Sequence, residues 1–450
     1  MNSNRKVFLF VVYSVSLYLL ASLLALVFHF NWMPFKRVNL ISDIVITHDS
    51  TSIGANNPDS NSIVIEDRPR ENFNLYHAPH FITNFSTDTT KPSLEKFLSK
   101  LYDLKTGKKR KIRIAYFGDS MIEGDLLTQT LRKLLQQSFG GYGVGFVPIT
   151  SQVSGFRQSA TEYNSSGWDD ESFKSGNSGR LFLSGHLFRS SGAWVQMKDN
   201  TIHDSAAIVE KSLLCGGSSG PVDISVNNYP FTVHTNDIFN RISLGNDANL
   251  GIKLSVANPS LPIYGVSFES DSGIFVDNFS FRGITGIEFA RIDSSFLSAV
   301  AAHNPYDLIV FQYGVNLLFR PNDRNFNWYA KALMPIVKKF RNCFPEADFL
   351  VVSTADRAFR YGGEYKSAVG IDSLVKIQAL LAFESGSCFY NQFETMGGTN
   401  SIVDWASRSP SLANRDYVHP NHRGAEVLGG YFYEAILNDL NKYILNLKDK

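Results

Sequence analysis

Residues 112–117, IRIAYF, run directly into Gly118-Asp119-Ser120, and this stretch decides the fold. A short apolar run that ends at a glycine is typical of a buried strand. A helical pattern follows and stops at Gly140-Gly141. Its apolar face consists of Leu127, Leu131, Leu134, Leu135 and Phe139. A buried strand followed by an amphipathic helix predicts an α/β fold with a parallel sheet.

Ser120 stands where the predicted strand gives way to the helix. Its hydroxyl would lie at the carboxyl edge of a sheet, where open α/β folds place their ligands. The free N–H groups of a helix N-terminus would favour the negative charge of an oxyanion. The alternative is that Asp119 and Ser120 merely cap the helix, because Asp and Ser are favoured there. The tripeptide alone does not decide between a nucleophile and a cap.

The far end of the chain supplies a base for such a nucleophile. The sequence DYVHP at residues 416–420 places Asp416 and His419 three residues apart. A serine hydroxyl is a weak nucleophile at neutral pH, and a histidine with a pKa of ~6.5 can take its proton and return it. An aspartate beside that histidine fixes its tautomer and stabilises the imidazolium. Ser120, His419 and Asp416 are therefore a candidate catalytic triad.

A third polar segment follows a second predicted strand. Residues 308–312, LIVFQ, have the pattern of a central strand and lead through Tyr313-Gly314-Val315 to Asn316. An asparagine just past a strand end can direct its side-chain amide at the same sheet edge as an oxyanion donor. A strand-terminal asparagine on its own is more often a turn residue. Together with the other two segments, Asn316 is better explained as part of a catalytic site.

These segments resemble the sequence blocks of the SGNH/GDSL hydrolases, which are GDS, a glycine block, GxN and DxxH in this order. Residues 281–286, FRGITG, are similar to the glycine block. The resemblance implies a flavodoxin-like three-layer core and a catalytic triad of Ser120, Asp416 and His419. It also implies an oxyanion site formed by the Ser120 N–H, Gly286 and Asn316, with Gly283 as the second choice of glycine.

A long segment, residues 150–278, separates the nucleophile block from the glycine block. It contains short runs with alternating apolar and polar residues, divided by Gly, Asn, Asp and Ser turns. Such runs predict an inserted β-sandwich domain. The runs are residues 180–183, 222–226, 231–234 and 252–256. A sandwich at this point resembles the domain arrangement of SGNH-type peptidoglycan O-acetylesterases. The segment from Met396 to Trp405 is also similar to members of that group.

Aromatic side chains of the insertion could form a platform on which sugars stack. The candidates are Trp168, Phe173, Phe182, Phe188 and Trp194. The alternative is that they belong to the core of the sandwich.

The N-terminal residues 7–30, VFLFVVYSVSLYLLASLLALVFHF, hold no Asp, Glu, Lys or Arg. As a helix they would span roughly 36 Å, enough for a ~30 Å hydrocarbon core. The alternative is a cleavable signal peptide, although its apolar region is normally only ~7–15 residues long. We predict a retained transmembrane anchor with an exported, extracytoplasmic body. The predicted organisation is an anchor (1–35), a polar stalk (36–90), and two parts of a catalytic core (91–149 and 279–450) that enclose the insertion (150–278).

Composition excludes several classes of partner. The 43 Lys and Arg residues balance the 42 Asp and Glu residues, so no global charge favours nucleic acid. Three cysteines are too few for a disulfide framework or a zinc site. The glycine-rich run over 140–145 follows a helix, so it predicts a turn and not a dinucleotide site. The histidines without metal-ligand spacing are His203, His234, His303 and His422. We predict no cofactor, no metal and no nucleic-acid partner.

The combined expectation is a membrane-anchored serine esterase that removes acyl groups, O-acetyl above all, from a cell-envelope glycan such as peptidoglycan or a polysaccharide. Two alternatives stay open. The same triad could transfer the acyl group to a sugar hydroxyl, which would make the protein an O-acyltransferase. The fold could also serve as a non-catalytic glycan-binding protein.

Overall fold

The computed structural model describes Tyr13, residues 71–175 and residues 179–448. The predicted anchor, except for Tyr13, and the predicted stalk up to residue 70 lie outside the described residues. Within the described ranges, no helix is both long and apolar enough to cross a membrane.

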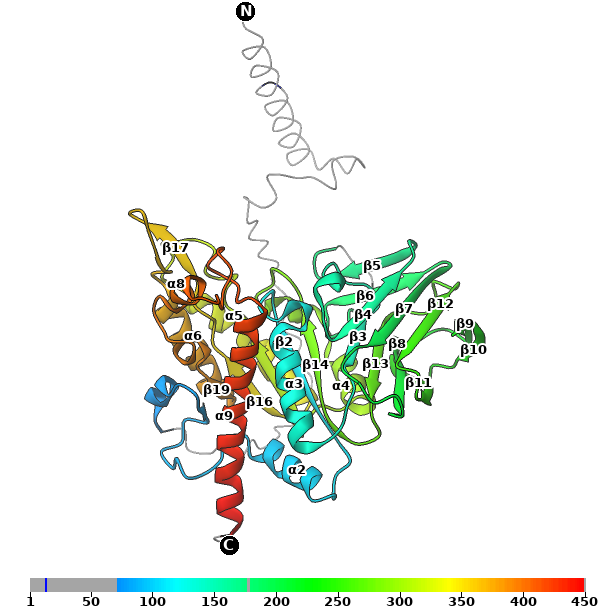
Figure 1. The fold of residues 1–450 in the computed structure, drawn as a ribbon, viewed down its shortest axis with the longest axis horizontal. Helices are drawn as coiled ribbons and strands as arrows, with labels where there is room; N and C mark the ends of the chain where they lie inside the picture. Colours follow the sequence, from blue (N-terminus) through cyan, green and yellow to red (C-terminus); the bar gives the residue numbers. More distant parts are fainter. Residues whose placement is uncertain (1–12, 14–70, 176–178, 449–450) are drawn as a thin grey trace, which may run out of the picture. The chain divides into compact units, whose positions relative to one another are not determined.

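A six-stranded sheet forms the centre of the fold, in the order β1-β19-β16-β15-β2-β14 (Figure 1). Its strands are β1 (Ile82–Thr83), β2 (Lys111–Gly118), β14 (Gly273–Ser280), β15 (Leu308–Gln312), β16 (Asp348–Val352) and β19 (Cys388–Tyr390). All are parallel except β1, which is antiparallel to β19. Counted along the chain, the five parallel strands take the flavodoxin-like order 2-1-3-4-5. The predicted parallel α/β core is confirmed.

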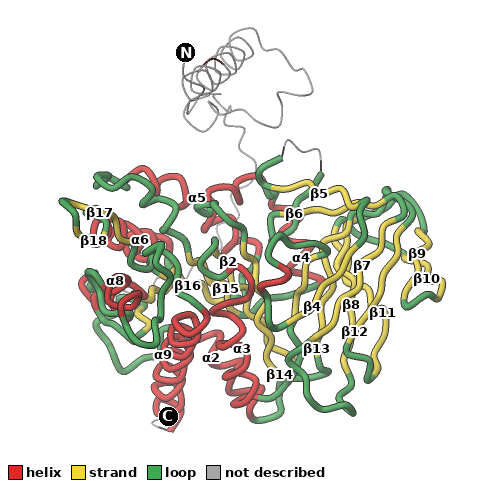
Figure 2. The backbone as a smooth tube through the Cα atoms, turned by 45° about the horizontal axis from the view of Figure 1, so that its top comes forward, coloured by secondary structure: helices red, strands yellow, loops and turns green. Residues whose placement is uncertain are grey.

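Helices cover both faces of this sheet (Figures 1 and 2). One face carries α2 (Glu95–Lys105), α3 (Leu126–Phe139) and α9 (His422–Lys448), and the other carries α4 (Ser294–His303), α5 (Asn327–Cys343) and α6 (Ile371–Ser385). Alternate residues of β2 serve the two layers: Ile112, Ile114 and Tyr116 pack on the first, and Ala115 and Phe117 on the second. Because both faces are buried, the strand is almost continuously apolar.

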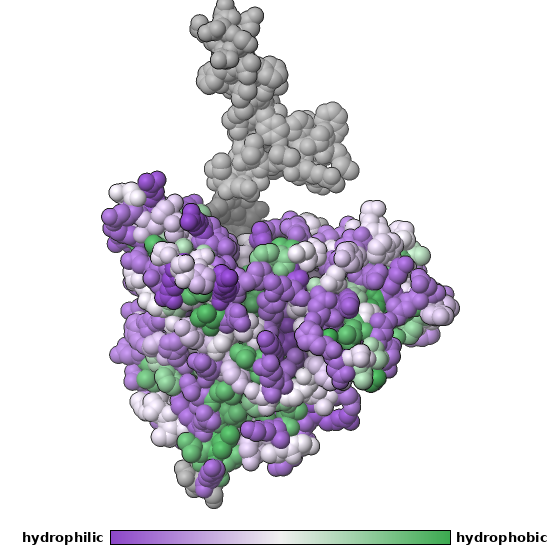
Figure 3. Space-filling view, in the orientation of Figure 1, coloured by the Kyte–Doolittle hydropathy of each residue, from purple (hydrophilic) through white to green (hydrophobic). Residues whose placement is uncertain are grey.

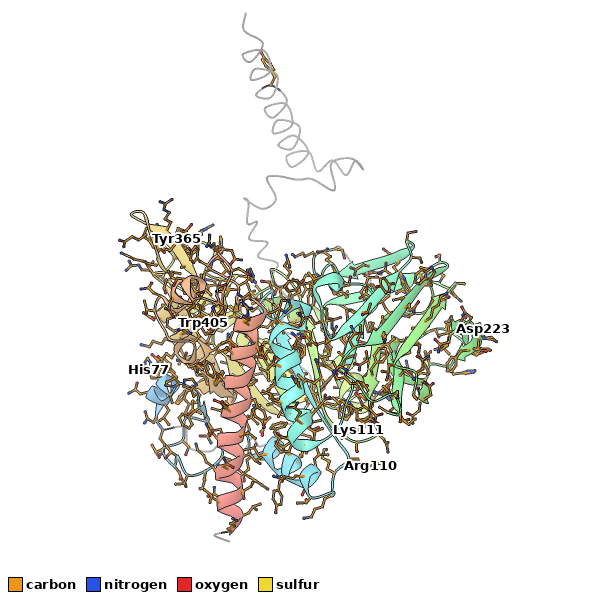
Figure 4. All side chains as sticks on the ribbon, viewed as in Figure 1. His77, Arg110, Lys111, Asp223, Tyr365 and Trp405 are labelled. Atoms are coloured by element: carbon orange, nitrogen blue, oxygen red, sulfur yellow. The ribbon has the colours of Figure 1, made fainter. Side chains whose placement is uncertain are left out.

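Short elements complete the core. They are the hairpin β17 (Ala358–Tyr361) and β18 (Glu364–Ser367), the helices α7 (Gln392–Thr395) and α8 (Ser401–Ser407), and the 3-10 segments η1 (Phe73–His77), η2 (Glu123–Asp125), η3 (Ser154–Phe156) and η4 (Ile287–Arg291). In Figure 4, Tyr365 on β18 and Lys111 at the start of β2 lie at opposite ends of the core. The carboxyl edge of the sheet is the end that carries the hairpin.

Two antiparallel sheets form a β-sandwich beside the core, in the orders β10-β9-β12-β7-β4 and β11-β8-β13-β6-β5, with β3 paired to β13. Apolar residues from both sheets, such as Val195, Leu213 and Leu254, form one shared core. The strands are β3 (Gly145–Pro148), β4 (Ala160–Asn164), β5 (Trp168–Ser172), β6 (His186–Ser190), β7 (Ala193–Asp199), β8 (Val209–Gly216), β9 (Val222–Val226), β10 (Tyr229–Val233), β11 (Phe239–Asp247), β12 (Gly251–Val256) and β13 (Ile263–Glu269). Of the four alternating runs, 180–183 is a loop that is buried from Leu181 on, 222–226 and 252–256 lie in β9 and β12, and 231–234 overlaps the end of β10.

Both boundaries of the inserted domain differ from the predicted residues 150 and 278. β3 lies before residue 150 yet pairs with β13 of the sandwich. β14 begins before residue 279 and pairs with β2 along its whole length. The physical reason is that strand partners are chosen by long-range pairing, which a local alternating pattern does not reveal. The chain therefore passes from sandwich to core in the short turn between β13 and β14.

Three of the five aromatic side chains considered for a sugar-stacking platform are buried and cannot form one. Phe173, Phe182 and Phe188 are buried in hydrophobic cores. Trp168 and Trp194 are half-buried, and the Trp168 Nε1 donates to the Trp194 carbonyl oxygen at 3.2 Å. The face seen in Figure 3 is mostly hydrophilic, and a groove lies there between α3 and the sandwich.

Candidate active site

Ser120, His419 and Asp416 meet at the carboxyl edge of the central sheet. The Ser120 Oγ lies 2.8 Å from the His419 Nε2, and the His419 Nδ1 lies 2.7 Å from the Asp416 Oδ2. The serine follows β2, whereas the other two residues precede α9, almost 300 residues further along the chain. The structure thus brings together a hydroxyl, an imidazole and a carboxylate in the order that a nucleophile, its base and the base's orienting group require.

The turn that carries Asp416 and His419 is held from two sides. The Asp416 Oδ1 accepts the N–H groups of Val418 at 3.0 Å and of His419 at 3.1 Å. Tyr417 has a φ of 55°, which is uncommon for a residue other than glycine. Its carbonyl accepts the Ala358 N–H at 2.9 Å, and its ring stacks on Tyr365 with centroids 4.0 Å apart. The hairpin β17–β18 therefore supports the conformation of this turn.

Asp416 is held in its ionised form. Partial burial alone would raise its pKa, but hydrogen bonds from the His419 ring and from the N–H groups of Val418 and His419 outweigh burial and lower the pKa to about 2. A carboxylate that stays negative at neutral pH can hold the Nδ1–H of the imidazole and leave the Nε2 free to accept a proton from Ser120.

The segment after Ser120 differs from the predicted strand-to-helix junction. Ser120 lies in a turn, and α3 begins only at Leu126, after the 3-10 segment η2. Gly124 and Asp125 have φ values of 71° and 64°, so the chain changes direction between the serine and the helix. The effect of a helix dipole falls off within the first turn. The predicted help from the α3 N-terminus, and the alternative that Asp119 and Ser120 cap α3, are both wrong.

Asn316 follows β15, the strand beside β2, and reaches the nucleophile loop. Its Nδ2 donates to the Asp119 Oδ2 at 3.1 Å and to the Ile284 carbonyl oxygen at 2.9 Å. The Asp119 Oδ1 also accepts the Met121 N–H at 3.0 Å. Asp119 therefore fixes the Asn316 amide, a positioning role that sequence reasoning missed. The sequence signal that could have indicated this role is that Asp119 directly follows β2, a strand that is buried on both faces.

The Asp119 carboxyl has a shifted acidity. Complete burial raises its pKa to about 7, against the opposing effects of the Met121 N–H, the His419 charge and the Gly314 N–H. An aspartate in an unfolded chain has a pKa of ~3.9. Between these two values the folded state binds more protons than the unfolded state, so the Asp119 contribution to stability falls as pH rises from about 4 to 7.

We therefore expect Asp119→Asn to lack this part of the pH dependence. Between pH 5 and pH 7.5 the native protein should lose a few kcal/mol of stability that the variant keeps. Urea unfolding at the two pH values measures it. Asp404→Asn, which changes an exposed carboxylate on α8, is the control. Equal pH dependence in the native protein and in Asp119→Asn would contradict the assignment.

The two candidate oxyanion glycines have different surroundings. Gly286 is buried, has a φ of 92°, and a Cβ there would lie 2.9 Å from the ring of Tyr313. Gly283 is exposed, and a Cβ there would meet only the Lys174 side chain. Residue 286 thus requires glycine for both conformation and space. An oxyanion role for the Gly286 N–H stays a prediction.

The histidines outside the triad have other neighbours. The His303 Nε2 lies 3.0 Å from the Asp237 Oδ2, and the His422 ring packs on Phe156 with centroids 4.6 Å apart. In residues 71–175 and 179–448, no group of three or more His, Cys, Asp or Glu side chains is arranged to hold a metal ion.

No protein-family model and no curated protein sequence matches the chain. Among solved structures, a peptidoglycan O-acetylesterase superposes with a TM-score of 0.67 at 20% identity, over 77% of this chain and 96% of that one. Two family two carbohydrate esterases are also found, both with TM-scores of 0.27. The one from Cellvibrio japonicus is 9% identical over 63% of this chain and 99% of its own. The one from Clostridium thermocellum, in complex with cellohexaose, is 11% identical over 61% and 100%. The chain therefore has the fold of the peptidoglycan O-acetylesterase, and the predicted resemblance to SGNH-type O-acetylesterases is confirmed at the level of the fold.

Proposed function

We propose that the protein is a serine esterase of the SGNH type that hydrolyses O-acetyl esters on a cell-envelope glycan. The observation that carries the proposal is the chain of contacts from the Ser120 Oγ through the His419 imidazole to Asp416, at 2.8 and 2.7 Å. The fold shared with a peptidoglycan O-acetylesterase supports the substrate class.

In the proposed reaction, the His419 Nε2 takes the hydroxyl proton while the Ser120 Oγ attacks the acyl carbon. The N–H groups of Ser120 and Gly286 and the Asn316 Nδ2 would stabilise the oxyanion. The tetrahedral intermediate expels the sugar oxygen, which takes the proton from His419, and leaves an acyl-enzyme. Water, deprotonated by His419, then attacks the same carbon and releases acetate and the free serine. Asp416 stabilises the imidazolium in both halves.

The Asn316 amide is anchored for this role. One of its contacts goes to the buried Asp119, and the other goes to the Ile284 carbonyl, which belongs to the loop that leads to Gly286. An oxyanion would compete with the Ile284 carbonyl for one N–H of the Asn316 amide. The other N–H stays bonded to Asp119 and holds the side chain in place. Catalytic hydrogen bonds often take their final geometry only in the complex with substrate.

Mass spectrometry of the full-length protein mixed with acetylated peptidoglycan tests the proposal. We expect released acetate and, after rapid acid quenching, one acetyl group on the peptide that contains Ser120. His419→Ala should prevent both, because the serine then lacks its base. Acetate release from an enzyme that never carries the acetyl group on Ser120 would refute the mechanism.

We also propose that the body is exported and anchored through the uncharged segment 7–30. The support comes from the sequence, because the segment is long enough for a hydrocarbon core. The full chain is expected to stay with membranes after carbonate extraction, and a form lacking residues 1–35 is expected to be released. A full chain that carbonate extracts would contradict anchoring.

A further inference from the structure

A polar pocket of about 210 Å³ lies between the core and the sandwich. One wall consists of the end of β14 and the segments after β2 and β14, with Glu123, Ser280 and Arg282. Sandwich residues Lys174, Ser184 and His186 form the other wall. Ser280 is paired with Gly118, two residues before Ser120. Neighbouring strands are ~4.8 Å apart and two residues span at most ~7 Å, so this wall begins within roughly 12 Å of the nucleophile.

The carboxylates that line the pocket already have partners. The pairs are Glu123–Arg282 at 2.6 Å, Asp125–Arg132 at 2.7 Å and Asp170–His186 at 2.7 Å. Glu123 and Asp125 thus contact arginines, and Asp170 contacts a histidine. Among the other lining groups, the Lys174 ammonium can only donate hydrogen bonds, and the hydroxyl of Ser184 can donate one.

Both donors belong to the sandwich. Lys174 is exposed, its Nζ lies 5.7 Å from the centre of the Phe281 ring, and it forms no ion pair among the described residues. Ser184 is only 4% exposed, and within the described structure its Oγ has no hydrogen-bond partner. A buried hydroxyl without a partner is unfavourable, and such groups are rare unless something else satisfies them.

We propose that this pocket is a substrate subsite that binds a carboxylate group of the glycan next to the ester. Lys174 would supply the positive charge, and the Ser184 hydroxyl would donate a hydrogen bond to a carboxylate oxygen. The inference rests on the proposed function, because an ester held at Ser120 is what brings the neighbouring part of a glycan to this wall. Selectivity for acidic glycans would then come from the inserted domain, and the bond-breaking chemistry from the core.

The test compares two substrates that differ in one charge. Acetylated oligogalacturonides carry free carboxylates, and their methyl esters keep the same sugars and acetyl groups without the charge. For the full-length protein, we expect kcat/KM for acetate release to be at least about tenfold higher for the acid form. The difference should lie in KM and should shrink at high salt, because Lys174 is exposed and its charge is screened.

Lys174→Met should bring the ratio of the two kcat/KM values close to one, and Lys174→Arg should restore much of it. The matched control is Lys198→Met, which removes another exposed lysine of the same sandwich. Lys198→Met should leave both the ratio and the hydrolysis of p-nitrophenyl acetate unchanged.

Ser184→Ala gives a second, independent readout. Removing a buried hydroxyl that has no partner should leave Tm unchanged or raise it, while the preference for the acid form falls. A structural hydroxyl would show the opposite pattern, with a lower Tm and an unchanged preference.

The outcomes separate the two proposals. A ratio near one in the native protein, no acetate release from either glycan while p-nitrophenyl acetate is cleaved, or a ratio that Lys174→Met leaves unchanged overturns the subsite and spares the esterase. Loss of all ester hydrolysis in the native protein overturns the proposed function itself.

Discussion

Ser120→Ala is expected to lower kcat for ester hydrolysis by about 10⁵–10⁶-fold, the scale seen when a triad serine is removed. The Oγ that would attack the acyl carbon lies 2.8 Å from the His419 Nε2, and among the described residues no second hydroxyl forms a hydrogen bond with that nitrogen. Without the Oγ, only the oxyanion donors and substrate binding remain, and they supply a small residual rate. Single-turnover assays with p-nitrophenyl acetate measure the loss.

The variant should fold normally, because the substitution removes one partly exposed hydroxyl. Tm within a degree or two of the native value, together with lost labelling by a fluorophosphonate probe, would separate lost chemistry from lost structure. Ser407→Ala, at the exposed end of α8, controls for nonspecific labelling. Hydrolysis within tenfold of the native rate would rule out Ser120 as the nucleophile.

Arg132→Met is expected to cost about 3–5 kcal/mol of stability, the range for breaking a buried ion pair. The Arg132 guanidinium, 1% exposed, donates to both carboxylate oxygens of Asp125 at 2.7 and 2.9 Å. Its Nε and Nη2 also donate to the Val276 carbonyl oxygen in β14. Removing the arginine leaves a buried carboxylate that has lost its bidentate partner and keeps only the Arg157 guanidinium, 3.6 Å away, as a positive neighbour. Chemical denaturation at pH 7 measures the change.

Two comparisons sharpen this expectation. Arg408→Met breaks an exposed i,i+4 pair with Asp404 and should cost less than about 1 kcal/mol. Asp125→Leu combined with Arg132→Met should recover much of the loss, because neither member of the pair is then left buried without the other. If Arg132→Met and Arg408→Met destabilise equally, the buried pair has no special role.

The acidity of Asp125 adds a pH signature. Burial alone would raise its pKa, but the charges of Arg132 and Arg157 outweigh burial and lower the pKa to about 2. The stabilisation is therefore complete above the unfolded value of ~3.9 and is lost as pH falls toward 2. Arg132→Met should unfold with a weaker dependence on pH in this acidic window than the native protein.

The sequence was sufficient for the strand β2 and for the residues that meet at its end. The apolar run over 112–117 is readable because both of its faces are buried, and Ser120, Asn316, Asp416 and His419 each stand beside such a strand or a strongly patterned helix. The structure brings Ser120, His419 and Asp416 into hydrogen-bond distance and places Asn316 beside the loop of Ser120, whereas their catalytic roles stay predictions.

The sequence was insufficient wherever distant residues decide the structure. β14 has the same short apolar character as the sandwich strands, and only its pairing with β2 assigns it to the core. The start of α3 depends on the buried contact between Asp125 and Arg132, which a capping preference does not reveal. The role of Asp119 depends on an asparagine that is 197 residues away in the sequence.

The pairing of β2 with β14 also orders events during synthesis. Roughly 160 residues separate the paired positions, and at ~5–20 residues per second the ribosome needs ~8–30 s to make them. The whole sandwich is synthesised in that interval, before either neighbour of β2 exists. The strand that leads to Ser120 therefore waits with two apolar faces and two unpaired edges, which exposes it to aggregation until its neighbours are made.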